Sequence, residues 1–150
     1  MPRADDARFD SDLAKIGSKD VTIATIDGTT SKTIADEDYA NIKQYAVTGD
    51  ADGFHLLLAV TTKRADVAFS DPFIANEFMK NNPNVLKRAN ASPVRVFGES
   101  FAVTKGEIKL RDMLNVALDQ MQQSGFIRAT LDRYLAEYKG EFFYVGKKWE

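Results

Sequence analysis

The chain has 150 residues, of which 44% are hydrophobic and 28% charged, and its formal net charge is -2. This length and balance predict one ordinary globular domain with a core of its own. The near-neutral charge offers no basic surface for nucleic acid, which is therefore excluded as a partner. Because the chain has no cysteine, disulfides, thiolate metal sites and a cysteine nucleophile are excluded. No motif for another metal or for a cofactor is found, so none is expected.

The hydrophobic pattern predicts alternating strands and helices from the N-terminus to about residue 96. The predicted strands are residues 21–26, 42–47 and 66–70, with short candidates at 85–87 and 94–96 and a longer one at 100–104. The predicted helices are a short one ending at Gly17, then residues 30–39, a helix capped by Asp50 that runs to about residue 63, and one that begins at Pro72 behind an Asp71 cap. Such alternation predicts an α/β fold with a parallel sheet.

Two amphipathic helices are predicted towards the C-terminus, separated by Gly125. Their apolar residues are Leu110, Leu114, Ala117, Leu118 and Met121 in the first helix and Ile127, Leu131, Tyr134, Leu135 and Tyr138 in the second. An aromatic tail with Phe142, Phe143, Tyr144 and Trp149 follows. Because apolar faces of this size rarely stay exposed, we expect them to fold back on the sheet or to pair with a second copy in a homodimer or swapped assembly.

The stretch VTIATIDGTTSKTIA, residues 21–35, predicts a strand, a turn at Gly28 and a helix capped by the hydroxyl groups of Thr29 and Thr30. A helix start directs unpaired N–H groups and a positive dipole end at one spot, which suits an anion. Ligands of parallel sheets bind beyond the carboxyl ends of the strands. Asp71 follows the third predicted strand, so Thr30 and Asp71 would lie within about 10 Å of each other if the first and third strands are neighbours.

Four segments resemble the type II periplasmic solute-binding proteins, specifically the amino-acid-binding branch that supplies ABC importers. The segments are DGTTSKTIA at 27–35, TTKRADVAFSD at 61–71, FGESFAVTKGE at 97–107 and MQQSGFIRATLDRYL at 121–135. They occur in the family's order and together cover the chain from about residue 2 to residue 138.

The resemblance implies a three-layer α/β lobe of the type II periplasmic-binding-protein fold with a mostly parallel sheet. Residues 1–98 correspond to the second lobe, and residues 99–150 to a strand crossing back towards the first lobe, the helix pair and the aromatic tail. Family members carry a signal peptide, most of the first lobe and a carboxylate-clamping arginine before this region. The chain is therefore expected to form one lobe with half of a binding site.

By the same resemblance, Gly28, Thr29 and Thr30 would hold the α-carboxylate of a ligand and Asp71 its α-ammonium group. The implied function is non-catalytic binding of a small amino-acid-like solute, with an ABC permease as partner and the periplasm as location. The first ten residues show no apolar export signal. Side-chain specificity belongs largely to the first lobe in this family, so the sequence does not identify the ligand.

Two other functions remain open. Receptors and transcription regulators use the same architecture for ligand sensing. Some dehydratases that act on cyclic acids share it too, and that activity would need a rim acid or base with a shifted pKa, for which Asp27 and Asp71 are the candidates. His55, the only histidine, is interpreted as a partly buried packing residue rather than a general base. Asp66, at the start of a strand, is interpreted as structural.

Overall fold

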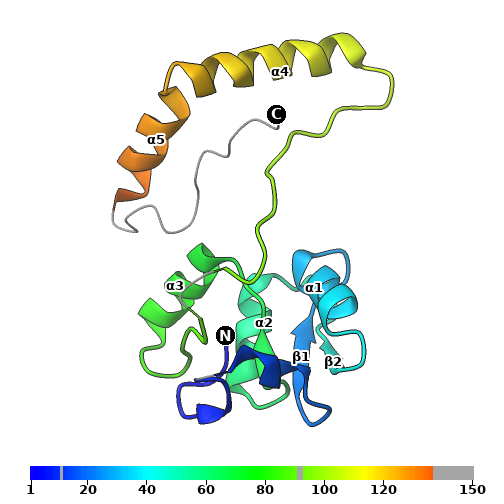
Figure 1. Cartoon of the computed structure of the whole chain (residues 1–150), viewed down its shortest axis with the longest axis vertical. Helices are drawn as coiled ribbons and strands as arrows, with labels where there is room; N and C mark the ends of the chain where they lie inside the picture. The colour runs from blue at the N-terminus through cyan, green and yellow to red at the C-terminus, as the bar shows by residue number, and fades with distance from the viewer. Residues whose placement is uncertain (11, 91–92, 137–150) are drawn as a thin grey trace. The chain divides into compact units, whose positions relative to one another are not determined.

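In the computed structural model, which describes residues 1–10, 12–90 and 93–136, the chain divides into two compact units, Met1–Val96 and Phe97–Glu150. The first unit contains the short 3-10 helices η1 (Ala7–Phe9) and η2 (Leu13–Gly17), followed by β1 (Thr22–Thr25), α1 (Thr30–Asp38), β2 (Lys43–Ala46), α2 (Gly53–Thr61), β3 (Val67–Ala68) and α3 (Pro72–Asn81), as Figure 1 shows. The second unit contains α4 (Ile108–Gln123) and α5 (Phe126–Tyr134). Within the described ranges no helix has the length and apolarity needed to span a membrane.

The sheet of the first unit has the strand order β2-β1-β3, and both pairs of strands are parallel. The register places Ile23 of β1 opposite Gln44 of β2 and Val67 of β3. All three predicted strands are confirmed, each with shorter bounds. Pro2 forms an antiparallel bridge with Val67, and Arg3 forms one with Leu86, so the predicted strand at 85–87 is reduced to a bridge.

Helices cover both faces of this sheet. Successive residues of β1 point to opposite faces, so Ala24 and Ile23 pack against different helices. Ala24 belongs to a buried cluster with Leu57 and other residues of α2 and with Phe78 of α3. Ile23 belongs to a second cluster with Ala35 of α1, together with buried residues of η1 and η2. The prediction of a three-layer α/β fold with a parallel sheet is confirmed.

Charged groups connect the N-terminal segment to two strands. The Arg8 guanidinium donates to Asp66 Oδ1 at 2.6 Å, and the Thr22 amide donates to Asp66 Oδ2 at 2.9 Å. Asp66 thus ties the start of β1 to the start of β3, in agreement with its predicted structural role. Arg8 also hydrogen-bonds to the buried Asp6, and this contact holds the pKa of that carboxyl below its ordinary value.

Three features of the sequence prediction need correction. Residues 94–96 and 100–104, predicted as strands, are not in strands, because a strand requires a ladder of hydrogen bonds and these residues pair with no strand in the described part of the chain. Helix α2 begins behind Asp52 rather than Asp50. The aromatic tail at 142–149 lies outside the described residues.

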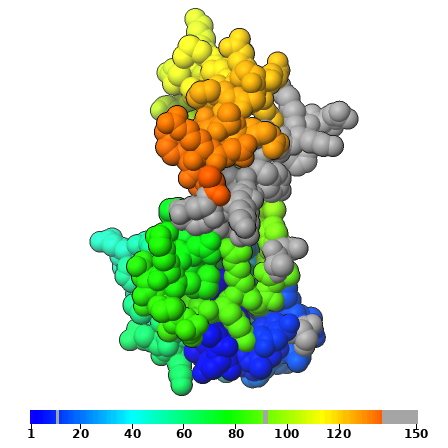
Figure 2. All heavy atoms as spheres, turned by 90° about the vertical axis from the view of Figure 1, so that its left-hand side faces the viewer, coloured from blue at the N-terminus to red at the C-terminus, as the bar shows by residue number. Residues whose placement is uncertain are grey.

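The second unit confirms the helix pair. Gly125, with a φ of +74°, separates α4 from α5 in a left-handed conformation that favours glycine. The apolar side chains of these helices (yellow and orange in Figure 2) include large ones that are more than half exposed. These are Ile108 at 57%, Met113 at 64%, Val116 at 59%, Phe126 at 58% and Tyr134 at 71%. No residue of α4 or α5 is buried.

Candidate functional site

The candidate site lies at the sheet edge where the parallel strands end. β1 is paired directly with β3, so the condition under which Thr30 and Asp71 were expected to lie close together is met. The Gly28–Thr30 turn follows β1, and Asp71 follows β3. Because parallel strands end at the same edge of a sheet, the strand order brings the turn and Asp71 to the same edge.

The turn between β1 and α1 depends on Gly28. Its φ of +76° lies in the left-handed region, where a side chain strains the backbone. A Cβ at this position would meet nothing within 4 Å, so the conformation rather than crowding requires glycine. The Thr29 amide then donates to the Ile26 carbonyl at 3.3 Å and closes the turn.

The hydroxyl groups at the start of α1 bond to one another and to the end of β1. Thr29 Oγ1 donates to the Ile26 carbonyl at 2.7 Å and lies 2.7 Å from Ser31 Oγ. The Ile26 amide donates to Ser31 Oγ at 3.2 Å. Since a hydroxyl has only one proton, Ser31 must donate to Thr29. Thr29 therefore makes no side-chain cap to α1, and the predicted hydroxyl cap at this residue is wrong.

Thr30 and the first amides of α1 remain available. Thr30 is exposed, and its hydroxyl and amide have no hydrogen-bond partner among the described residues; the same holds for the amide of Ser31. The amides of Lys32 and Thr33 already donate to the Thr29 carbonyl at 3.1 and 3.2 Å. The helix start therefore presents two backbone donors, one hydroxyl and the positive end of its dipole, a set that suits a carboxylate.

Asp71 caps α3 as predicted. Its Oδ1 accepts from the Phe73 amide at 2.7 Å, and Pro72 occupies the first helical position. The side chain is exposed, and Oδ2 has no partner in the described part of the chain. One carboxylate oxygen thus remains free to accept from a cationic group.

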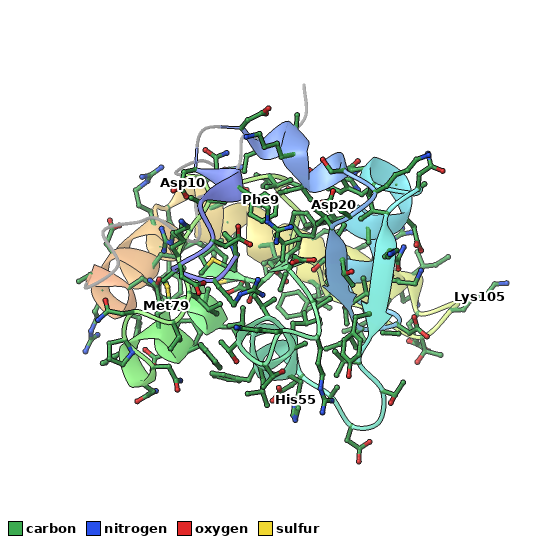
Figure 3. All side chains as sticks on the ribbon, turned by 90° about the horizontal axis from the view of Figure 1, so that it is seen from below. Phe9, Asp10, Asp20, His55, Met79 and Lys105 are labelled. Carbon is green, nitrogen blue, oxygen red and sulfur yellow. The ribbon has the colours of Figure 1, made fainter. Side chains whose placement is uncertain are left out.

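The prediction that His55 is a packing residue is wrong. His55 is exposed on α2, and its side chain lies on the outer surface in Figure 3. The Asp52 amide donates to His55 Nδ1 at 3.2 Å, and Asp52 Oδ1 accepts from the amides of Phe54 and His55, so that the two residues form a capping box. The hydrogen bond from His55 lowers the pKa of Asp52. Sequence reasoning missed this box because histidine replaces the usual Glu or Gln at its last position.

No metal cluster accompanies the site in the described residues. They contain no group of three or more His, Asp or Glu side chains that could hold a metal ion. An open hollow of about 680 Å³ lies in the second unit. It is lined by Gln120, Met121, Gln123, Ser124 and Phe126. None of these residues belongs to the sheet edge that carries the predicted site residues.

No family model matches the chain, and no curated protein matches it. Several solved structures do match the chain. The ancestral amino-acid-binding protein AncCDT-1, a precursor of cyclohexadienyl dehydratase, matches 88% of this chain with 23% identity and a TM-score of 0.66. The cysteine-binding protein from Campylobacter jejuni matches 97% with 21% identity and a TM-score of 0.65. An ancestral arginine-binding protein bound to glutamine matches 77% with 21% identity and a TM-score of 0.56.

The chain has the fold of amino-acid-binding proteins. The resemblance seen in the sequence is thus confirmed for the fold. The match covers 53%, 54% and 50% of those three solved chains, so the chain spans about half the length of each.

Proposed function

We propose that the chain binds a small amino-acid-like solute without catalysis, as the extracytoplasmic binding component of an ABC importer. The permease of that importer would be its partner and the periplasm its location. The observation that carries this proposal is the strand order, which brings the unpaired donors of α1 and the free oxygen of Asp71 to one sheet edge. The amino-acid-binding proteins that share the fold support it.

In this proposal the ligand carboxylate accepts from the Thr30 hydroxyl and from the amides of Thr30 and Ser31. Gly28 shapes the turn that presents these donors, and its missing side chain leaves the approach to the backbone open. Thr29 contributes only by closing the turn, since its hydroxyl and its amide both donate to the Ile26 carbonyl. Asp71 Oδ2 accepts from the ligand's ammonium group.

We infer that these groups make up half of a binding site, and their magnitudes predict weak binding. A hydrogen bond to a charged group contributes about 1.5–3 kcal/mol. A helix terminus adds about 0.3–1 kcal/mol. One such bond and the helix terminus together correspond to a Kd of about 1 mM, and the entropy lost on association, about 4–15 kcal/mol, offsets the remaining hydrogen bonds of the site.

The test is calorimetry and NMR titration of the whole chain with L-arginine, L-glutamine and L-cysteine. We expect no micromolar affinity, and shifts confined to the amides near Thr30 and Asp71. Thr30→Val and Asp71→Asn should each weaken these shifts at a given ligand concentration, whereas Thr33→Val, which changes a hydroxyl on the same helix, should leave them. Micromolar binding would contradict the half-site. Shifts at other residues, or none, would contradict the assigned site.

A dehydratase activity is the second candidate, because AncCDT-1 is described as a precursor of cyclohexadienyl dehydratase. Asp27 is exposed next to the turn and would be the acid or base of such a reaction. Incubation with a cyclohexadienyl acid, followed by mass spectrometry for loss of one water, separates the two functions. Turnover that disappears in Asp27→Asn would favour the enzyme over the non-catalytic binding protein.

A further inference from the structure

Ser31 is a buried polar residue in the first turn of α1, with 2% of its surface exposed. Its hydroxyl accepts from the Ile26 amide at 3.2 Å and lies 2.7 Å from Thr29 Oγ1. Ile26 directly follows the last residue of β1. Ser31 thus ties the end of the central strand to Thr29, the N-cap residue of the helix that follows it.

This arrangement decides what the Thr29 hydroxyl can do. A threonine at the N-cap position ordinarily accepts from the second or third amide of its helix. Thr29 occupies that position with the extended backbone typical of it, yet makes no such bond. Its hydroxyl donates to the Ile26 carbonyl at 2.7 Å and accepts from Ser31. The second amide of α1, that of Ser31, therefore keeps its proton free.

We propose that Ser31 is a positioning residue, which holds the Thr29 hydroxyl away from α1 and so leaves the amides of Thr30 and Ser31 open to a ligand carboxylate. The assignment rests on the proposed function for the identity of the ligand group. Ser31 itself would touch no ligand and would act on the site through Thr29. Without the Ser31 hydroxyl, Thr29 turns to the amide of residue 31 and becomes an ordinary cap.

A positioning role of Ser31 and a purely structural role predict different effects on carboxylate binding. Loss of a purely structural hydrogen bond lowers stability and leaves the donors of the folded chain as they were. Loss of the positioning contact adds a competitor for one of those donors, so it weakens carboxylate binding by the folded chain. One neutral hydrogen bond in competition predicts about a fivefold loss of affinity.

The experiment uses the full chain, with sodium acetate as the carboxylate probe, sodium chloride as the salt control and NMR as the readout. In Ser31→Ala we expect the Thr29 side chain to change rotamer, the amide proton of residue 31 to become hydrogen-bonded and the acetate affinity to fall about fivefold. Ser31→Thr, which keeps a hydroxyl, should restore the wild-type pattern. Thr33→Val should change neither readout.

A second variant makes the mechanism specific. Thr29→Val combined with Ser31→Ala removes the competing hydroxyl and should recover most of the lost affinity. An unchanged Thr29 rotamer and unchanged acetate affinity in Ser31→Ala would overturn the positioning role. If the wild-type chain binds no acetate, the proposed ligand site fails, while the rotamer and the amide of residue 31 still decide whether Ser31 holds Thr29.

Discussion

Thr25 offers a direct test of how the end of β1 is built. Its side chain is fully buried, and its hydroxyl has no hydrogen-bond partner in the structure as described. A buried, unsatisfied hydroxyl destabilises a fold by about 1–3 kcal/mol. Valine replaces that hydroxyl with a methyl group and keeps the β-branched shape that suits a strand. Thr25→Val should therefore stabilise the chain by about 1 kcal/mol, which raises the melting temperature by roughly 2–4 °C at this size.

Urea unfolding followed by circular dichroism measures the effect, with the slope m unchanged if the unfolded state is the same. The matched control is Thr25→Ser, which keeps the hydroxyl and removes the methyl group. It should destabilise the chain by about 1 kcal/mol through lost apolar contact. Should the valine variant also unfold at lower urea than the wild type, the hydroxyl has a partner and the reasoning fails.

Three further predictions address the turn, the N-terminus and the helix pair. Gly28→Ala places a side chain at a φ of +76° and should destabilise the chain by about 1 kcal/mol in thermal unfolding, whereas Gly17→Ala, at an open position without positive φ, should be near neutral. In the 150-residue chain with a free α-amine, burial lowers the pKa of the Met1 amine from 8.0 to about 5. Between pH 5 and pH 8 the unfolded chain binds a proton that the folded chain does not. The free energy of unfolding should therefore fall as the pH drops from 8 to 5, by at most about 4 kcal/mol. Acetylation of the amine should remove this pH dependence. The exposed apolar face of α4 and α5 predicts a homodimer in light scattering that Met113→Asp weakens, and a wild-type monomer would contradict it.

The elements of the sheet were accessible from the sequence because each has a local physical cause. The apolar, β-branched run before Gly28 predicted the central strand, and the Asp71-Pro72 pair predicted the start of α3. Alternation of strands and helices predicted the parallel arrangement. Those local signals placed Gly28 and Asp71 after their strands, and the strand order then brought both to the same edge.

The position of a helix start was less accessible, because it depends on packing between elements. Asp50 and Asp52 both have the side chain of a good N-cap. Gly53 lies so close to α3 that a Cβ there would come within 2.7 Å of the Ile74 Cδ1 atom. The chain begins α2 at this glycine, and the His55 side chain completes the cap from one turn further on. The contact with Ile74 cannot be inferred from spacing along the chain, and the His55 cap has the usual spacing but an unusual residue at its last position.

The number of free donors was least accessible, because the sequence shows hydroxyl groups and not the bonds they already make. Two adjacent threonines predict two side-chain donors for a carboxylate. In the folded turn the Thr29 hydroxyl donates to the Ile26 carbonyl, and the Ser31 hydroxyl donates to Thr29 Oγ1. One hydroxyl and two amides remain, so a ligand at this edge would be recognised mainly by the backbone. Substitutions that move a backbone donor should therefore affect binding more than the loss of the Thr29 hydroxyl alone.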